Sequence, residues 1–504
     1  YLSDIKLLGA FKDIFNLTNG TRGGLINYWL YFVIRLIIFI LLFILIKKYK
    51  DKQYKRNVLY IIPLILLIIF SLPIKKFNSI IKSTDILDKD YNSITTNIDN
   101  YAFYGMLGGM YYNIVNSRIF EPNNYYKEEL KEIMNYQSSD EKEMDYNIIF
   151  ILSESFYDIS KIDEIKYDQD IIKDYHELKE KGKLVNMLSP TFGGKTGNVE
   201  FELLTGINLA YYDSSYIPYM YVTKDYFKNN DNLLMLLKKN NIDVTYYKNA
   251  SESIYNVRNV YKYLGFSDKI KSSNNKKDFK GYYASDKYVT DQIIDYTSNS
   301  NEPFFLFTTT MQNHMPYVED KYDKYDMKLI DSKLSKEEEG VLLAYSEGLY
   351  DASIELKRLY DYINTIDKKT IIIFIGDHLP YLSNSKGENI IDKLNYFNTK
   401  DNLLNLYRKY SVEALVLSNF DIDYDDTEYL SPDLLIPYVL KSNQTKMNSY
   451  YNYLIEKSKS ILPSYNRNVA VDCDGKIYDI NKLPKDMKKE YDLRNSIQYN
   501  LYYE

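Results

Sequence analysis

The hydrophobic positions of this chain form two kinds of pattern, which divide it near residue 75. Before this point lie two long apolar runs, at 27–46 and 58–74. Each is long enough to cross the hydrocarbon core of a membrane as a helix, and neither shows the polar face of a globular helix. We therefore expect a membrane region over residues 1–74. The alternative is a buried pair of core helices.

The segment between the two runs, residues 47–57, is strongly basic. The positive-inside rule places such a loop in the cytoplasm, so everything after Ile74 should face outward. This predicts a multi-pass protein of the cell membrane with an extracytoplasmic domain. The chain begins with Tyr1 rather than Met, and we expect an upstream portion, with further spans, to precede it.

From Tyr146 onward, short and continuously apolar runs alternate with helical stretches. Such runs are typical of strands buried on both faces, and the stretches between them fit crossover helices. The pattern predicts an α/β sandwich with a mainly parallel sheet, in which ligands bind where the strands end. The expected strands are 147–153, 242–247, 303–310, 370–376 and 413–419, and the expected helices are 198–204, 231–240, 285–297 and 336–366.

The same pattern divides the outer part into three. Residues 75–145 form a linker with helices, one of them near 124–136; residues 146–442 form the catalytic domain; and residues 443–504 form a C-terminal extension.

A net charge of −6 supplies no general attraction for phosphate backbones, which argues against nucleic-acid binding. The single cysteine, Cys473, excludes an internal disulfide and a Cys-rich zinc site.

Polar residues are concentrated where the predicted strands end. Glu154 follows the first strand, and Asp377 and His378 follow the strand at 370–376. Carboxylates and an imidazole at adjacent strand ends are suitable ligands for Mn²⁺, Mg²⁺ or Zn²⁺. Taken alone, Glu154 could equally be a carboxylate at a helix N-terminus, and Asp377 could be a cap.

A glycine-rich segment at 189–198, SPTFGGKTGN, precedes a predicted helix. Its glycines let the backbone approach a ligand closely, and Thr196 stands where helix amides favour an anion such as phosphate. The spacing is not that of a Walker A loop. The alternative is that Thr196 only caps its helix.

The chain contains three histidines, and two of them follow predicted strands. His314 comes after the strand at 303–310, where an imidazole could meet a phosphoryl oxygen or a leaving group. His176 lies in a charged, helix-like segment and is expected to be an exposed surface residue.

Four motifs, SESFYD, SPTFGGKTGNVEFELLTG, QNHMPY and GDHLP, occur in this order. Together they resemble the lipoteichoic acid synthase family of sulfatase-like membrane phosphoglycerol transferases, over roughly residues 145 to 440. The resemblance implies a sulfatase/alkaline-phosphatase-like fold. It also implies that Glu154, Thr196, Asp377 and His378 bind Mn²⁺, with Mg²⁺ as the alternative.

The resemblance implies two substrate-binding residues as well. His314 matches the family histidine that contacts the phosphoglycerol group, and Arg258 is the counterpart of an arginine that grips phosphate. Arg258 is displaced by one residue from the family pattern. Some members place a histidine where this chain has Lys248.

These features predict a metal-dependent phosphotransferase that works through a phosphothreonine at Thr196, because metal coordination can activate a hydroxyl nucleophile. By resemblance, the donor would be a membrane phospholipid, phosphatidylglycerol, and the acceptor a glycolipid or glycan polymer of the cell envelope. The alternatives are a phosphoethanolamine transferase or phosphodiesterase with the same site, and an inactive envelope scaffold. Sulfate ester hydrolysis is disfavoured. A sulfatase needs a cysteine or serine in a formylglycine-type motif, and the single cysteine, Cys473, lies far along the sequence from the candidate site.

Overall fold

The computed structural model describes residues 121–503 apart from 123, 137, 139–140, 214–215, 228–230, 249–255, 274 and 331. All of them belong to the second of two compact units, Asn116–Glu504. The predicted membrane region, 1–74, lies outside the described residues. Among the residues that are described, no helix combines the length and the apolar character needed to cross a membrane.

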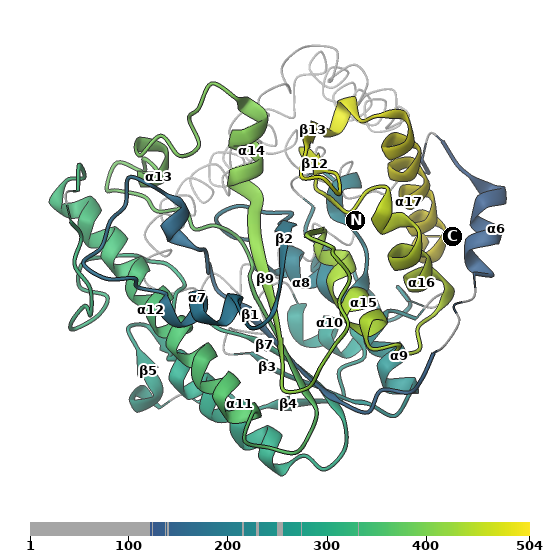
Figure 1. Cartoon of the computed structure of the whole chain (residues 1–504), viewed down its shortest axis with the longest axis horizontal. Coiled ribbons are helices and arrows are strands. Elements are labelled where there is room, and N and C mark those ends of the chain that lie inside the picture. Colours follow the sequence, from purple (N-terminus) through teal and green to yellow (C-terminus); the bar gives the residue numbers. More distant parts are fainter. Residues whose placement is uncertain are drawn as a thin grey trace, which may run out of the picture. The chain divides into compact units, whose positions relative to one another are not determined.

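A large sheet lies at the centre of the described unit (Figure 1). Its strand order is β10-β2-β9-β8-β1-β7-β3-β4, and every neighbouring pair is parallel except the two made by β9. The mainly parallel α/β class predicted from the sequence is therefore confirmed. The strands are β1 (Asn147–Ser153), β2 (Lys183–Leu188), β3 (Asp243–Lys248), β4 (Asp268–Ile270), β7 (Phe304–Thr309), β8 (Thr370–Gly376), β9 (Ser411–Ser418) and β10 (Tyr429–Leu430).

The strands β1 and β8 form the middle of this sheet and have the bounds that the apolar runs predict. Every residue of both strands is buried, because helices cover both faces of a parallel sheet. The register pairs Ser153 with Gly376, and on the other side of β1 it pairs Leu152 with Thr309 at the end of β7. The three strands therefore end side by side at one edge.

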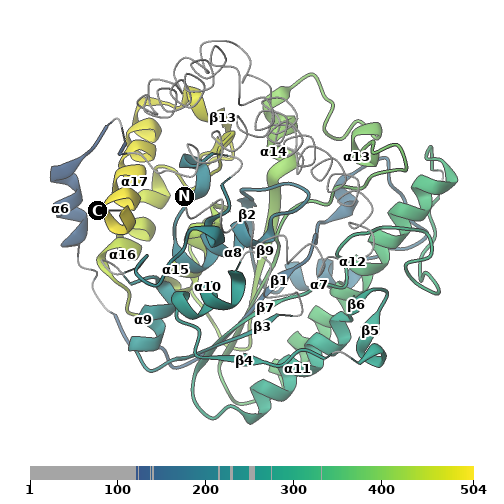
Figure 2. The ribbon, with the colours of Figure 1, turned by 180° about the vertical axis from the view of Figure 1, so that it is seen from behind.

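Helices cover the two faces of the sheet. Figures 1 and 2 show α7, α11 and α12 on one face and α8, α9, α10 and α15 on the other. The helices are α6 (Lys127–Met134), α7 (Lys173–Lys179), α8 (Thr196–Thr205), α9 (Leu233–Lys239), α10 (Val257–Leu264), α11 (Asp286–Asn299), α12 (Lys336–Ile363), α13 (Ile390–Lys393), α14 (Asn402–Tyr410), α15 (Pro432–Ser442), α16 (Ser449–Glu456) and α17 (Lys485–Tyr503). The long α12 begins with a capping box formed by Ser335 and Glu338.

Two small sheets complete the described unit. One is the hairpin of β5 (Phe279–Lys280) and β6 (Tyr283–Ala284), and the other contains β11 (Ser464–Tyr465), β12 (Val469–Val471) and β13 (Ile477–Asp479). The C-terminal residues are packed firmly: Arg494 of α17 and Asp433 of α15 form an ion pair with no exposed side-chain surface.

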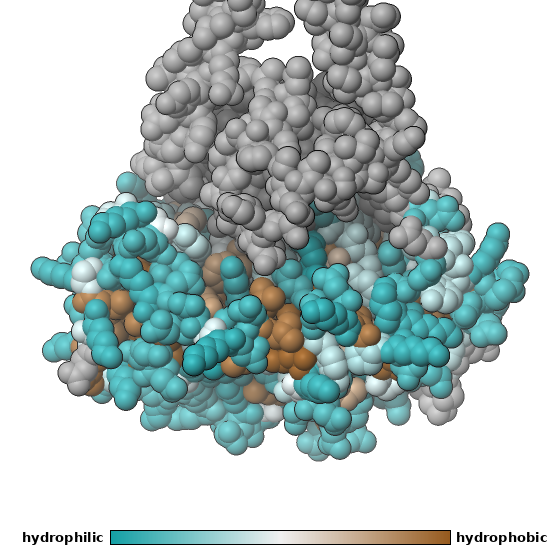
Figure 3. All heavy atoms as spheres, turned by 90° about the horizontal axis from the view of Figure 1, so that it is seen from above, coloured by the Kyte–Doolittle hydropathy of each residue, from teal (hydrophilic) through white to brown (hydrophobic). Residues whose placement is uncertain are grey.

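One face of the described surface is mainly hydrophilic, with apolar side chains gathered towards its middle (Figure 3). Few large apolar side chains of the described residues are strongly exposed. They are Met134, Tyr282, Val318, Ile330 and Ile461.

His176 takes part in a half-buried charge network, so its predicted position as an exposed surface residue is wrong. Its Nδ1 lies 2.7 Å from Asp170 Oδ2, and its Nε2 lies 3.3 Å from Asp158 Oδ1. Lys179 extends the network from Asp158 to Glu413. The hydrogen bond to Asp158, opposed by burial and aided by Asp170, raises the pKa of His176 to about 9.

We expect the free energy of unfolding to fall as the pH rises from about 6.5 to about 9. The folded protein holds a proton on His176 more tightly than the unfolded chain does. The protonated imidazole therefore stabilises the fold fully below pH 6.5, the pKa in the unfolded chain, and this stabilisation is lost as the pH rises through the folded-state pKa of about 9. His176→Gln should remove the part of this fall that His176 causes, which is worth about 1 to 3 kcal/mol for a half-buried pair. Urea unfolding across this pH range measures it, with the exposed Lys173→Gln as control. An equal slope in His176→Gln would contradict the assignment.

Candidate active site

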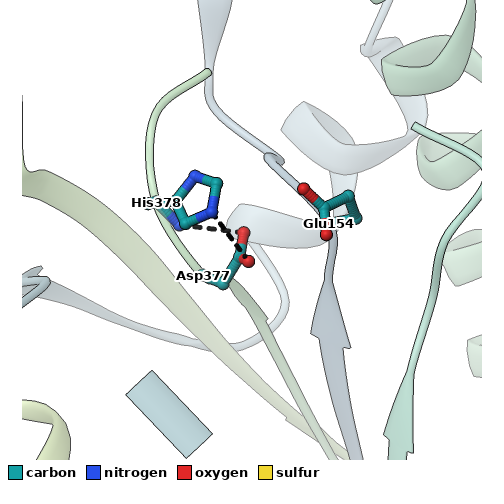
Figure 4. Close-up of side chains that lie close together, drawn as sticks. All are labelled: Glu154, Asp377 and His378. Carbon is teal, nitrogen blue, oxygen red and sulfur yellow. Dashed lines mark hydrogen bonds and ion pairs between the residues drawn. The ribbon is translucent and has the colours of Figure 1, made fainter. Parts of the chain in front are cut away.

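Three potential metal ligands meet at the edge where β1 and β8 end (Figure 4). Glu154 directly follows β1, and Asp377 and His378 directly follow β8. All three are buried, and one ligand atom from each lies within 4.8 Å of the others. The parallel register explains the meeting, because it brings the carboxyl ends of the two strands level.

The Asp377 carboxylate connects the segments of this cluster. Its Oδ1 accepts hydrogen bonds from the backbone N–H groups of Ser155, at 2.8 Å, and His378, at 2.9 Å. Its Oδ2 accepts a hydrogen bond from Thr196 Oγ1 at 2.6 Å and lies 3.2 Å from His378 Nε2. The structure therefore brings Thr196 together with Glu154, Asp377 and His378.

The glycine-rich loop has unusual backbone dihedral angles just before Thr196. Gly193 and Lys195 have φ values of 67° and 64°, and α8 begins immediately afterwards at Thr196. A Cβ atom at Gly193 would lie 2.8 Å from the Cβ of Tyr381, so both its dihedrals and its space require glycine. The N-cap residue is Lys195, and no side chain caps the helix. The alternative that Thr196 is only a cap is therefore wrong, since its hydroxyl is directed at Asp377.

The backbone around the ligands is equally constrained. Ser155 has a φ of 53°, in the left-handed region that non-glycine residues rarely adopt. A Cβ atom at Gly376 would lie 1.9 Å from the carbonyl oxygen of Phe156, so the strand that ends before Asp377 must end in glycine. The turn at Ser155 and the close approach of Gly376 to Phe156 accompany the hydrogen bond from the Ser155 N–H to Asp377.

The chemistry of the cluster fits a divalent cation. Burial, and then the neighbouring Asp377, raise the pKa of Glu154 to about 8, so a nearby positive charge would stabilise its carboxylate. His378 Nδ1 lies 3.0 Å from the carbonyl oxygen of Leu379, which assigns the ring proton to Nδ1. Its Nε2 is buried, lies 3.2 Å from Asp377 Oδ2 and makes no hydrogen bond, so its lone pair is left for a metal. The Thr196 hydroxyl is a fourth potential ligand.

His314 is held as a neutral imidazole. Its Nδ1 lies 2.8 Å from the carbonyl oxygen of Met315 and 3.1 Å from the hydroxyl of Tyr283, so the ring proton is assigned to Nδ1. Burial lowers the pKa of His314. Its Nε2 therefore keeps a lone pair that can accept a proton or a hydrogen bond.

The remaining predicted residue, Arg258, is exposed in the first turn of α10. The loop before this helix, 249–255, lies outside the described residues. Lys248, at the end of β3, is buried and forms an ion pair with Glu200 of α8. Its Nζ also donates to the hydroxyl of Tyr261 at 3.3 Å.

Sequence reasoning missed two buried residues around the cluster. Ser189 Oγ donates to the carbonyl oxygen of Asp377 at 2.7 Å. Lys321 Nζ donates to the carbonyl oxygen of His314 at 2.9 Å, and burial lowers its pKa to about 7. Ser189 opens the glycine-rich motif and could have been suspected from its place, whereas the sequence contains no signal that separates Lys321 from other lysines.

Comparison with known proteins assigns the family. The sulfatase family profile matches residues 146–458, and the chain belongs to this family. A curated relative, a putative cyclic β-1,2-glucan modification protein of Rhizobium meliloti, is 34% identical over 240 residues, which are 47% of this chain and 36% of that protein. The match therefore spans only about a third of the relative's length.

Two solved structures share the fold. The phosphoglycerol transferase GacH of Streptococcus pyogenes, solved in complex with sn-glycerol-1-phosphate, has a TM-score of 0.60 and 22% identity, covering 76% of this chain and 95% of GacH. The lipoteichoic acid synthase LtaP of Listeria monocytogenes has a TM-score of 0.53 and 17% identity, covering 74% of this chain and 96% of LtaP.

We expect Asp377→Ala to abolish Mn²⁺ binding, because it removes one ligand and releases the Ser155, His378 and Thr196 groups that the carboxylate holds. Titration calorimetry of the metal-depleted protein measures the loss, and the exposed Asp361→Ala is the control. Metal binding by the parent protein at pH 7 should also release a proton from Glu154. Full metal affinity in Asp377→Ala would remove Asp377 from the ligand set.

Proposed function

We propose that this protein is a metal-dependent phosphotransferase that transfers glycerol phosphate from phosphatidylglycerol to a glycolipid or glycan polymer of the cell envelope. One observation carries the proposal: the Thr196 hydroxyl, at the start of a helix, is hydrogen-bonded to a carboxylate of the metal-ligand cluster. The phosphoglycerol transferase GacH and the lipoteichoic acid synthase LtaP, which share the fold, support the class of substrate.

Glu154, Asp377, His378 and Thr196 would hold the metal, with Mn²⁺ as the preferred ion and Mg²⁺ as the alternative. A bound divalent cation would lower the pKa of the Thr196 hydroxyl and stabilise negative charge on phosphoryl oxygens. The hydrogen bond to Asp377 Oδ2 fixes the hydroxyl proton, so the oxygen lone pairs face away from Asp377. Because α8 begins at Thr196, its first backbone N–H groups lie close to this residue and favour a bound phosphate.

Transfer takes two displacements. Thr196 Oγ1 loses its proton and forms a bond to phosphorus while the bond to the diacylglycerol oxygen breaks; that oxygen takes up a proton, so diacylglycerol leaves as an alcohol and glycerol phosphate stays on Thr196. The acceptor hydroxyl then loses its proton and forms a bond to phosphorus while the Thr196 ester breaks, and the threonine oxygen regains a proton. His314 Nε2 can accept the proton of the acceptor hydroxyl, because Nδ1 already donates to Met315.

Thr196→Ala should retain the fold and lose transfer by several orders of magnitude, because it removes the nucleophile. Its stability should fall by only about 1.5 to 3 kcal/mol, the value of one hydrogen bond to a charged group. Transfer rate and melting temperature are measured on the same preparations, with Thr191→Ala, in the same loop, as control. A folded Thr196→Ala protein with near-normal transfer would leave direct attack by the acceptor as the mechanism.

The donor is tested with labelled lipids. Incubation with phosphatidylglycerol should yield diacylglycerol and a glycerol phosphate adduct of Thr196 that intact-protein mass spectrometry detects. Transfer from phosphatidylethanolamine alone would instead indicate a phosphoethanolamine transferase, and free glycerol phosphate without an acceptor product would indicate a phosphodiesterase. Metal binding without turnover of either lipid would favour a scaffold.

We also propose that the enzyme is a multi-pass protein of the cell membrane whose catalytic domain faces outward. The basic segment 47–57 between two apolar runs supports this topology. Protease added to intact cells should remove the domain after residue 75, while a cytoplasmic marker protein stays intact. Protection of the domain in intact cells would contradict the orientation.

A further inference from the structure

A turn of the C-terminal region reaches the loop that carries Thr196, although it lies beyond the matched sulfatase residues, 146–458. The strands β11 and β12 pair antiparallel, and residues 466–468 connect them. We define these three residues, Asn466, Arg467 and Asn468, as the C-terminal turn.

Asn466 uses its carboxamide in two directions. Its Oδ1 accepts hydrogen bonds from the backbone N–H groups of Asn468, at 2.8 Å, and Val469, at 3.1 Å, which close the C-terminal turn. Its Nδ2 donates to the carbonyl oxygen of Ser189 at 3.1 Å. Only 3% of Asn466 is exposed, so neither atom can exchange its partner for bulk water without opening the structure.

Ser189 connects the C-terminal turn to the metal-ligand cluster. It is fully buried, and its Oγ donates to the carbonyl oxygen of Asp377. Its own N–H donates to the carbonyl oxygen of Tyr410 at 2.8 Å. Ser189 is therefore held from three sides, by Asn466, Asp377 and Tyr410.

Arg467 contacts the chain on the other side of α8. Its Nε donates to the carbonyl oxygen of Tyr212 at 2.8 Å, and its Nη2 donates to that of Leu209 at 3.4 Å. Ser189 precedes α8 and Leu209 follows it, so the C-terminal turn is bonded to both segments that flank the helix beginning at Thr196.

A closed turn alone would need only the Oδ1 bonds of Asn466. The Nδ2 bond to Ser189 and the two Arg467 bonds are not made within the turn; they connect it to the segments before and after α8. We propose that Asn466 and Arg467 are positioning residues, which hold the loop and α8 so that Thr196 and Asp377 keep their mutual geometry. The inference rests on the proposed function for the role of Thr196, but its effect on metal binding does not depend on any substrate.

Asn466→Asp separates the two uses of the side chain. It keeps an oxygen for the N–H groups of Asn468 and Val469, but it places a second oxygen against the carbonyl oxygen of Ser189. We expect Mn²⁺ affinity of the full chain to fall about tenfold, at the lower end of the range for partners of metal ligands. We expect kcat to fall with KM for the lipid nearly unchanged. Calorimetry measures the affinity in the absence of lipid.

Asn468→Ala is the matched control, because the contacts of Asn468 within the turn are made by its backbone. It should leave Mn²⁺ affinity unchanged. The route through Ser189 predicts a further result: in a Ser189→Ala background, Asn466→Asp should cause little additional loss of affinity, because the link to Asp377 is already broken.

Arg467→Met provides a second variant if Asn466→Asp does not fold. It should lower kcat without raising KM, because the segment after α8 loses its hydrogen bonds to the Arg467 guanidinium. Unchanged Mn²⁺ affinity in a folded Asn466→Asp protein, unchanged kcat in Arg467→Met, or additive losses with Ser189→Ala would overturn the inference. A protein that binds Mn²⁺ with the expected dependence on Asn466 but transfers no lipid would instead overturn the proposed function.

Discussion

A buried carboxylate, that of Asp377, is the constraint on which the site depends. An isolated carboxylate without contact with water is destabilised by several kcal/mol unless hydrogen bonds compensate it. Here the compensation comes from Ser155, His378 and Thr196, which belong to the ends of two strands and the start of a helix. Satisfying one charge therefore fixes the relative positions of three segments, and this arrangement also creates the ligand cluster.

Much of the fold could be predicted from the apolar runs alone. The strands β1 and β8 were predicted with their observed bounds, because strands buried on both faces are apolar throughout. The strand β2 was not predicted, since Lys183 and Asn186 interrupt its apolar residues and its first half is only partly buried. The reversed direction of β9 was not predicted either, because an apolar run has the same pattern whichever way the strand runs.

The candidate site, too, could be predicted only in part from the sequence. The sequence singled out Glu154, Asp377 and His378 because charged residues directly after buried strands are conspicuous, and the structure brings these residues together. It did not indicate Lys321 or Asn466, which are ordinary polar residues in polar segments, and it indicated Ser189 only as the first residue of the glycine-rich motif. The significance of Ser189 and Asn466 arises from contacts across long stretches of chain, such as the 277 residues between these two, and no local pattern encodes those contacts.

The wide spacing of these residues also means that the parts of the site are synthesised at different times. Ser155 and Asp377 are 222 residues apart, so at synthesis rates of about 5 to 20 residues per second the second segment follows the first by about 10 to 45 s. During this interval Glu154 is a lone carboxylate, which has no particular preference among divalent cations. Any selectivity between cations can therefore arise only once the segment that carries Asp377 and His378 has been made and the ligand cluster has assembled.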